Sequence, residues 1–215
     1  MKAPVATPQA ASLKALKVVD VSTRVAASSE HAGSAAVKRV LKELREVAAR
    51  NPSVWLHEGH EGGIHIYPSE TDLMLWRVLI EGPKGSPFEG GVFSLIVRIP
   101  AEYPFKPPSV RFETPVYHCN VNDGGGICLG ILDDGWSPSL SVPKALEGVR
   151  LMLKTPDTDH ALRQWIAELT LAGKKVRTPE EGPDTRYVDE ARRRTRQDAS
   201  RSVADFEREW GGAAA

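Results

Sequence analysis

The pattern of apolar positions along the chain predicts one helix near residue 34, then a run of short strands, then more helices. Ser34 is a residue type that caps helices, and apolar residues recur after it at the spacing of one helical face. These residues are Val37, Val40, Leu41, Leu44, Val47 and Ala48. The helix should end near Asn51-Pro52, because the residue before a proline disfavours helical backbone.

Strand-like segments follow this helix. They cover Ile64–Tyr67, Leu73–Glu81, Val92–Ile99 and Ser109–Phe112. The connections between them are rich in Gly and Pro, as in "GPKGSPFEGG" at 82–91, and such residues are typical of turns. Consecutive strands with short connections favour an antiparallel meander over parallel βαβ units.

Helical patterns return after residue 141. We predict helices over Val142–Lys154 and Ala161–Ala172, and one long charged helix over 185–210 that places Val203, Phe206 and Trp210 on one face. The order of elements predicts a single α+β domain over 34–212, with an enlarged loop near 173–185 and an extended C-terminal helix. Residues 1–33 are rich in Ala, Ser, Thr and Pro, which predicts a disordered extension.

Composition narrows the classes of function. Of the 215 residues, Lys and Arg total 28 and Asp and Glu total 28, so no net charge favours nucleic acid or an anionic membrane as a partner. No apolar run reaches the roughly 20 residues of a membrane span, and the N-terminus lacks the apolar block of a signal peptide. Two cysteines are too few for a secreted disulfide scaffold, which favours the reducing cytoplasm or nucleus.

Both cysteines, Cys119 and Cys128, lie in "VYHCNVNDGGGICLGILDDGWSPSLSV" at 116–142. Zinc is disfavoured because there is no CxxC spacing and only His118 lies nearby. A disulfide between them is disfavoured in a reducing compartment, and no papain-like signature surrounds Cys128. For Cys119 we favour a small buried apolar role, whereas Cys128 follows a flexible Gly124–Gly126 run that suits an exposed loop.

Several motifs then occur in a fixed order. They are SPFEGGVF at 86–93, YPFKPP at 103–108, His118-x-Asn120 eight residues before the GxICL cysteine Cys128, and WSPSLSV at 136–142. With these motifs the chain resembles the ubiquitin-conjugating enzyme (E2) family over 34–171 and again over 187–199. The resemblance implies the UBC fold: an N-terminal helix, a four-stranded antiparallel meander, an active-site stretch and C-terminal helices.

The resemblance also implies a transferase chemistry. Cys128 would accept ubiquitin from an activating enzyme (E1) as a thioester and pass it to a substrate lysine, usually with a ligase (E3). No bound cofactor or metal is implied, because ATP is used by the E1. The thioester stage suits a thiol, since the carbonyl of a thioester reacts readily with amines.

Assisting residues are implied by position in the family pattern. Asn120 would donate a hydrogen bond to the developing oxyanion or brace the loop, and both roles stay open. His118 would brace the loop and not act as a base. Asp159 matches an acidic position, and His160 stands where the family usually has Asp or Ser. A histidine there can accept a proton near neutral pH, although a solvent-exposed histidine without a role is as common.

Two partner surfaces are implied in the same way. Lys38, Arg39 and Lys42 match the basic helix face that meets the E1 and helps to meet ligases. Phe105, Pro138 and Ser139 match the ligase-binding loops. Without the resemblance, the basic residues would be an ordinary solvated helix face and Phe105 a possible core residue. Trp76 and Trp136 are assigned to packing.

Departures from the family pattern leave alternatives open. Cys119 replaces the usual proline between His118 and Asn120, which removes a constraint on the backbone that presents Asn120. Gly130 stands where an Asp is frequent. The alternatives are an E2 for another ubiquitin-like modifier, an E2-like binding module with weak or no catalysis, and an enzyme regulated by oxidation of Cys119 with Cys128.

Overall fold

The computed structural model describes residues 34–50, 63–69, 71–175 and 184–210. Helix α2 (Ala35–Arg50) is followed by strands β1 (Ile64–Pro68), β2 (Leu75–Glu81), β3 (Val92–Arg98) and β4 (Ser109–Phe112). Then come the short 3-10 helix η2 (Gly130–Leu132) and helices α3 (Val142–Lys154), α4 (Gln164–Lys174), α5 (Arg186–Asp198) and α6 (Val203–Trp210). The extension predicted for 1–33 and most of the loop predicted near 173–185 lie outside the described residues.

The strands form one antiparallel sheet in the order β1-β2-β3-β4, so the predicted meander is confirmed. Helix α2 begins as predicted, because the Ser34 hydroxyl accepts a hydrogen bond from the Val37 amide at 3.2 Å. Helix α3 and strand β4 have the predicted bounds. Strand β2 starts at Leu75 and not at Leu73, because Asp72 forms a turn by accepting from the Met74 and Leu75 amides.

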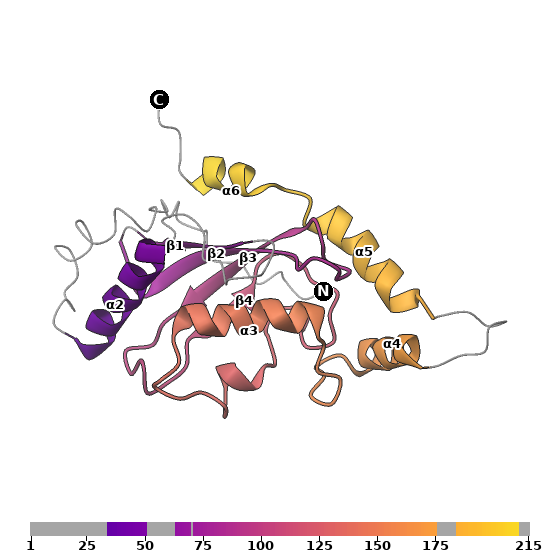
Figure 1. The fold of residues 1–215 in the computed structure, drawn as a ribbon, viewed down its shortest axis with the longest axis horizontal. Helices are drawn as coiled ribbons and strands as arrows, with labels where there is room; N and C mark the ends of the chain where they lie inside the picture. Colours follow the sequence, from indigo (N-terminus) through magenta and orange to yellow (C-terminus); the bar gives the residue numbers. More distant parts are fainter. Residues whose placement is uncertain (1–33, 51–62, 70, 176–183, 211–215) are drawn as a thin grey trace, which may run out of the picture.

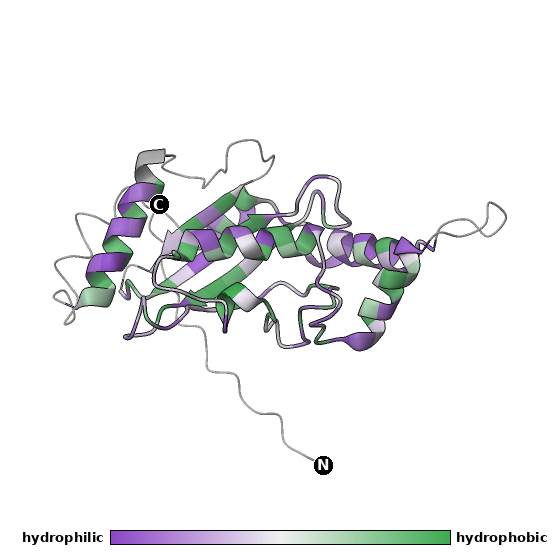
Figure 2. Ribbon diagram, turned by 60° about the horizontal axis from the view of Figure 1, so that its bottom comes forward, coloured by the Kyte–Doolittle hydropathy of each residue, from purple (hydrophilic) through white to green (hydrophobic). Residues whose placement is uncertain are grey.

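Helix α3 covers one face of the sheet (Figure 1). Side chains alternate along the strands, so every second residue points toward α3. Hydrophobic residues dominate the strands beneath this helix (Figure 2). The main core consists of these strand residues and of the inner faces of α2 and α3, including Trp76, Val78, Ile80, Phe93, Leu95, Val97, Val40, Leu44, Leu146, Val149 and Leu153. Burial of these apolar side chains stabilises the domain by roughly 25 cal/mol per Å² of apolar area removed from water.

The opposite face of the sheet is covered by α6 (Figure 1). Here Tyr67, Leu79 and Val92 form a second apolar cluster with Phe206 and Trp210 of α6. The Tyr67 and Trp210 rings meet edge to face with centroids 5.4 Å apart, and the Tyr67 hydroxyl donates to Glu207 at 3.0 Å. Val203, Phe206 and Trp210 therefore share one helical face, as predicted.

The single long helix predicted over 185–210 is wrong, because the structure has α5 and α6 separated by residues 199–202. Ser202 starts a new helix. Its hydroxyl accepts from the Asp205 amide at 3.2 Å, while its own amide and hydroxyl donate to the Asp205 carboxylate at 2.9 and 2.8 Å. This reciprocal cap begins α6, whereas α5 ends where the Ala199 amide donates to the Thr195 carbonyl at 2.9 Å. The Ala199 carbonyl accepts from the Val92 amide of β3 at 2.9 Å.

A buried carboxylate joins three separate parts of the fold. Glu43 of α2 is 3% exposed, and its Oε1 accepts from Arg39 Nε at 2.6 Å and from the Tyr103 hydroxyl at 2.5 Å. Its Oε2 accepts from the Val142 amide at the start of α3 at 3.0 Å. Burial of this carboxylate is tolerated because three donors reach its two oxygens, one of them at a helix N-terminus. Glu43 thereby fixes α2, the loop at 103 and α3 relative to one another.

Candidate active site

Cys128 lies at the end of a tight turn that packs against β4. The Asn122 side-chain oxygen accepts from the Gly124 and Gly126 amides at 2.9 and 2.8 Å, and the Asn122 amide donates to the Gly126 carbonyl at 3.0 Å. The glycine run therefore forms an Asx turn within the expected loop. Sequence reasoning missed Asn122, although an Asn two residues before a glycine is a signal for such turns.

Gly125 is the glycine that the geometry of this turn requires. Its φ is +80°, and a Cβ atom there would lie 2.0 Å from the Phe112 carbonyl oxygen. The Phe112 amide in turn donates to the Gly125 carbonyl at 2.9 Å. This close approach of the Phe112 backbone fastens the turn before Cys128 to the end of β4.

The two cysteines have different surroundings. Both thiols are free, and Cys128 is half-buried while Cys119 is fully buried in the main core. The Cys128 amide donates to the Asn120 carbonyl at 2.9 Å, beside an antiparallel bridge between Val121 and Ile127. Burial raises the pKa of the Cys119 thiol, so this sulfur stays protonated and donates toward Asn120 Oδ1 at 3.3 Å. Of the two thiols, only that of Cys128 is partly accessible to solvent.

Asn120 is fully buried and its side chain holds the loop at 156–161. Nδ2 donates to the Asp157 carbonyl at 2.7 Å and to the His160 carbonyl at 3.1 Å. Oδ1 accepts from the Asp157 amide at 3.0 Å. Both Nδ2 protons are thus donated to backbone carbonyls of the loop at 156–161, which is the geometry of a side chain that braces this loop. Donation to an oxyanion would require Nδ2 to release one of these carbonyls.

His118 connects the same stretch to α3. It is fully buried, its Nδ1 accepts from the Asn120 amide at 3.1 Å, and Nε2 therefore carries the proton that it donates to the Met152 carbonyl at 3.0 Å. Burial lowers the pKa of His118 to about 4, so the ring is neutral at physiological pH. A neutral ring with both nitrogens bonded to backbone groups orients Asn120 and has no free nitrogen for proton transfer.

This histidine should make the protein less stable in mild acid. The unfolded chain binds a proton at His118 below about pH 6.5, whereas the folded protein does not until about pH 4. Stability is therefore lost as the pH falls from 6.5 to 4, by about 3 kcal/mol in total for this group. Urea unfolding at several pH values measures this loss. A His118→Gln variant should be less stable at pH 7 but should show a flatter decline, and an unchanged decline would contradict the assignment.

The loop at 156–161 places Asp157 and His160 in direct contact. His160 Nδ1 lies 2.9 Å from Asp157 Oδ2, and Asp157 Oδ1 accepts from the Asp159 and His160 amides at 3.1 and 3.3 Å. Hydrogen bonding to His160 lowers the pKa of Asp157, and the same contact raises the pKa of His160. Asp159 and His160 are exposed, as is Asp157, which sequence reasoning did not single out. Two aspartates in one loop give no signal as to which one faces the histidine.

The start of α4 is fixed to the cysteine stretch. The Cys119 carbonyl accepts from the Leu162 and Arg163 amides at 2.9 and 3.0 Å, which explains why α4 begins at Gln164 and not at the predicted Ala161. Arg163 also forms an ion pair of 2.7 Å with Asp123 in the glycine turn. The turn before Cys128, the Asn120 segment and the loop at 156–161 are therefore bonded to one another.

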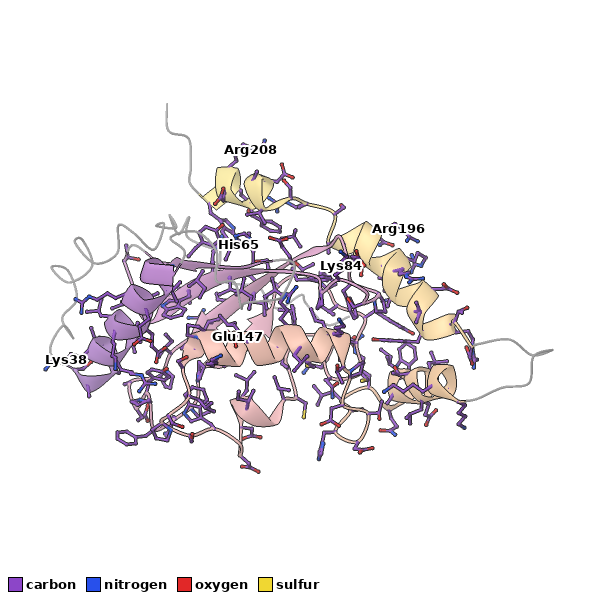
Figure 3. The ribbon with its side chains drawn as sticks, in the orientation of Figure 1. Lys38, His65, Lys84, Glu147, Arg196 and Arg208 are labelled. Carbon is purple, nitrogen blue, oxygen red and sulfur yellow. The ribbon has the colours of Figure 1, made fainter. Side chains whose placement is uncertain are left out.

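The residues expected to meet partners are distributed over two surfaces. Lys38 and Lys42 are exposed on α2, and Lys38 projects outward (Figure 3). Arg39 differs, because its guanidinium donates to Glu43 and, at 2.7 Å, to the Leu140 carbonyl. Its contacts are therefore internal ones, and it joins α2 to the segment that precedes α3.

The second surface is formed by two connected loops. Phe105 is 77% exposed, and Pro138 and Ser139 are exposed as well. Trp136 joins the two loops, because its Nε1 donates to the Pro104 carbonyl at 2.7 Å and its ring packs on Tyr103. Trp76 is fully buried in the main core and donates to the Leu73 carbonyl at 2.8 Å. Phe105 is therefore outside the core, and an exposed aromatic beside a proline suits a small docking patch.

In the part of the chain that the structure describes, no three His, Cys, Asp or Glu side chains gather as a metal ion would require. Within the same residues, no helix is both long and apolar enough to span a bilayer.

The chain is similar to known proteins in sequence and in fold. The profile of the family described as "Ubiquitin-conjugating enzyme" matches residues 39–177. A probable ubiquitin-conjugating enzyme E2 31 of Arabidopsis thaliana is 38% identical over 134 residues, which are 62% of this chain and 80% of the relative. Among solved structures, the E2 domain of a ubiquitin-conjugating enzyme from Toxoplasma gondii matches with a TM-score of 0.60 at 29% identity, over 75% of this chain and 98% of that domain.

Proposed function

The chain belongs to the ubiquitin-conjugating enzyme family, and from this membership we propose that Cys128 is the residue that carries ubiquitin as a thioester. The protein has the UBC fold and is an E2, a transferase. One observation supports Cys128 over the other thiol more than any other. Cys128 is partly accessible at the end of an ordered turn, whereas Cys119 is fully buried with a raised thiol pKa.

The proposed reaction has two stages. In the first, the Cys128 thiolate attacks the activated C-terminal carbonyl of ubiquitin on the E1, which has already used ATP, and the bond from this carbonyl to the E1 breaks as the new C–S bond forms. In the second, the amine of a substrate lysine attacks the thioester and Cys128 leaves as the thiol. Asn120, Asp159 and His160 assist this second stage, Asn120 by ordering the loop at 156–161 or by meeting the oxyanion, and the other two by receiving the lysine proton.

Membership of the family implies ubiquitin, an E1 and E3 ligases as general partners. We assign Lys38 and Lys42 to the contact with the E1, while Arg39 supports this helix from inside the fold through Glu43 and Leu140. We assign Phe105, Pro138 and Ser139 to ligase contacts, since they lie on two loops that Trp136 holds together. Because Cys128 must stay reduced to be charged, we place the working protein in the cytoplasm or nucleus.

A charging assay tests the proposed function. The protein is incubated with E1, ATP and ubiquitin and analysed on non-reducing gels, where we expect an adduct that thiol reductants remove. Parallel reactions use SUMO or another ubiquitin-like protein with its own E1. An adduct with one of these and none with ubiquitin would change the modifier, and no adduct with any modifier would leave the E2-like binding module as the explanation.

A further inference from the structure

The exposed carboxylate–imidazole pair in the loop at 156–161 consists of His160, which we assigned to receiving the lysine proton, and Asp157, which has no role in the function described so far. From its geometry we infer that Asp157 is a positioning residue for transfer to lysine, because it holds His160 in the orientation and tautomer in which Nε2 receives the lysine proton. This inference rests on the proposed function of Cys128. It deepens that function, because it assigns the proton acceptor of the second stage to a pair of residues and not to a single side chain.

The Asp157 carboxylate is itself held in place. Oδ1 accepts hydrogen bonds from the Asp159 and His160 amides at 3.1 and 3.3 Å. Oδ2 is therefore free to contact His160 Nδ1, at 2.9 Å. The Asp157 main chain is fixed as well, since its amide and carbonyl bond the Asn120 side chain at 3.0 and 2.7 Å. An isolated surface ion pair gains little, because two flexible side chains must be ordered, but here the backbone orders the carboxylate.

The pair is joined to Cys128 through one residue. The Asn120 backbone carbonyl accepts a hydrogen bond from the Cys128 amide at 2.9 Å. The Asn120 side-chain Nδ2 donates a hydrogen bond to the His160 carbonyl at 3.1 Å. The backbones of the thiol and of the imidazole are thus both bonded to Asn120. A change in the position of the loop at 156–161 would therefore break contacts to the segment that carries the Cys128 amide.

The contact with Asp157 determines which nitrogen is free. An ionised carboxylate can only accept, so His160 Nδ1 must carry a proton and the lone pair of the neutral ring is on Nε2. The His160 side chain is 75% exposed, so an incoming amine can reach Nε2. Asp157 and, more weakly, Asp159 raise the pKa of His160 above its ordinary value of 6.5, which suits a base that works near neutral pH.

The other charged groups near the loop fit this assignment. Arg163 lies directly after the loop and is neutralised by Asp123 at 2.7 Å, so no unpaired cation of that helix start opposes protonation of His160. Cys128 itself carries no charge while it is acylated by ubiquitin. The protonation of His160 is therefore governed by Asp157 and Asp159, which lie in its own loop.

The proton balance of the step is simple. His160 Nε2 takes one proton from the lysine ammonium and becomes an imidazolium, whose charge Asp157 stabilises. The neutral amine attacks the thioester carbonyl, a C–N bond forms and the C–S bond breaks. The departing Cys128 sulfur takes the second proton that the amine nitrogen loses, and His160 returns its proton to water.

An Asp157→Asn variant separates this role from a purely structural one. The asparagine oxygen still accepts backbone amides, but its NH₂ group would donate to Nδ1 and leave the proton on Nε2, where no lone pair remains to receive another. The assay follows the discharge of preformed thioester to free lysine in single turnovers between pH 6 and 9. Rates are normalised to the thioester present at the start, so the first stage does not enter the result.

We expect the wild-type discharge rate to rise with pH as His160 loses its proton. At higher pH, the rate should follow only the fraction of lysine that is present as free amine. Asp157→Asn and His160→Gln should each lower the rate at pH 7.5 on the order of 100-fold and remove that rise. The double variant should be slower than either single variant by no more than about twofold, as for residues that act as a unit. Glu168→Gln on the exposed surface of α4 removes one carboxylate without touching the loop and should behave as wild type.

Other outcomes would overturn the inference. If Asp157→Asn is slow but keeps the wild-type pH profile, or if its effect adds to that of His160→Gln, Asp157 only shapes the loop. His160→Gln guards against a folding artefact, because this side chain is 75% exposed. If His160→Gln discharges at the wild-type rate across the whole range, the histidine is not the acceptor. Failure of the wild-type protein to form any thioester would instead contradict the function proposed for Cys128.

Discussion

A Cys128→Ala variant should form no reductant-sensitive adduct with ubiquitin, because no other accessible thiol is present: Cys128 and Cys119 are the only cysteines of the chain and Cys119 is fully buried. The expected effect is complete loss of charging within the detection of a non-reducing gel. A Cys128→Ser variant keeps the shape of the turn but replaces the thiol by a far weaker nucleophile, so any adduct should form slowly and resist reductants as an ester.

Cys119→Ala is the matched control for this experiment. It removes the other sulfur, with its contact to Asn120 Oδ1 at 3.3 Å, and should lower the free energy of unfolding by about 1 kcal/mol, as a typical core substitution does. Charging should persist. If Cys119→Ala abolished charging while circular dichroism showed a folded protein, the roles assigned to the two cysteines would have to be exchanged.

Asn120→Ala should have the second largest effect, and it should act after charging. The variant should still accept ubiquitin, but its discharge to free lysine should slow on the order of 100-fold, as when an oxyanion donor or its support is removed. It should also lose about 1–3 kcal/mol of stability, because the Asp157 amide and two carbonyls lose their buried partner.

Hydrogen exchange distinguishes the two roles of Asn120. If bracing dominates, the Asp157 amide of Asn120→Ala should exchange much faster than in the wild type, and adding Asp157→Asn should slow discharge little further. If a direct contact with the oxyanion dominates, discharge should slow while the loop at 156–161 stays protected. Lysine discharge at the wild-type rate would remove Asn120 from the catalytic residues altogether.

Much of the fold could be predicted from the sequence, since the two periods of apolar residues distinguish α2 and α3 from the strands. The division between α5 and α6 was missed because the apolar positions Val203, Phe206 and Trp210 continue a helical spacing. The signal against it was local, since Ser202 and Asp205 form the Ser-x-x-Asp pattern that begins a helix. An apolar period reports which residues face a core but not whether the backbone between them is continuous.

The candidate active site could be predicted in part. The motifs around Cys128 were specific, but the partners of each polar side chain were not readable, because Asn120, Asp157 and His160 meet through backbone atoms 37–40 positions apart. Arg39 was expected on a partner surface, yet Glu43 lies four residues later on the same helix and binds it. That local pairing was visible in the sequence, whereas the contacts of Glu43 with Tyr103 and Val142 depend on the tertiary fold.

Because α6 covers its own face of the sheet, we expect the two faces of the sheet to become exposed in separate unfolding steps. Its apolar cluster with Tyr67, Leu79 and Val92 shares no side chain with the main core beneath α3, and only residues 199–202 connect it to α5. Partial unfolding of α6 would expose an apolar patch on β1, β2 and β3 while leaving Cys128 and its loops assembled. We therefore expect a chain that lacks α6 to self-associate before the activity of Cys128 is lost.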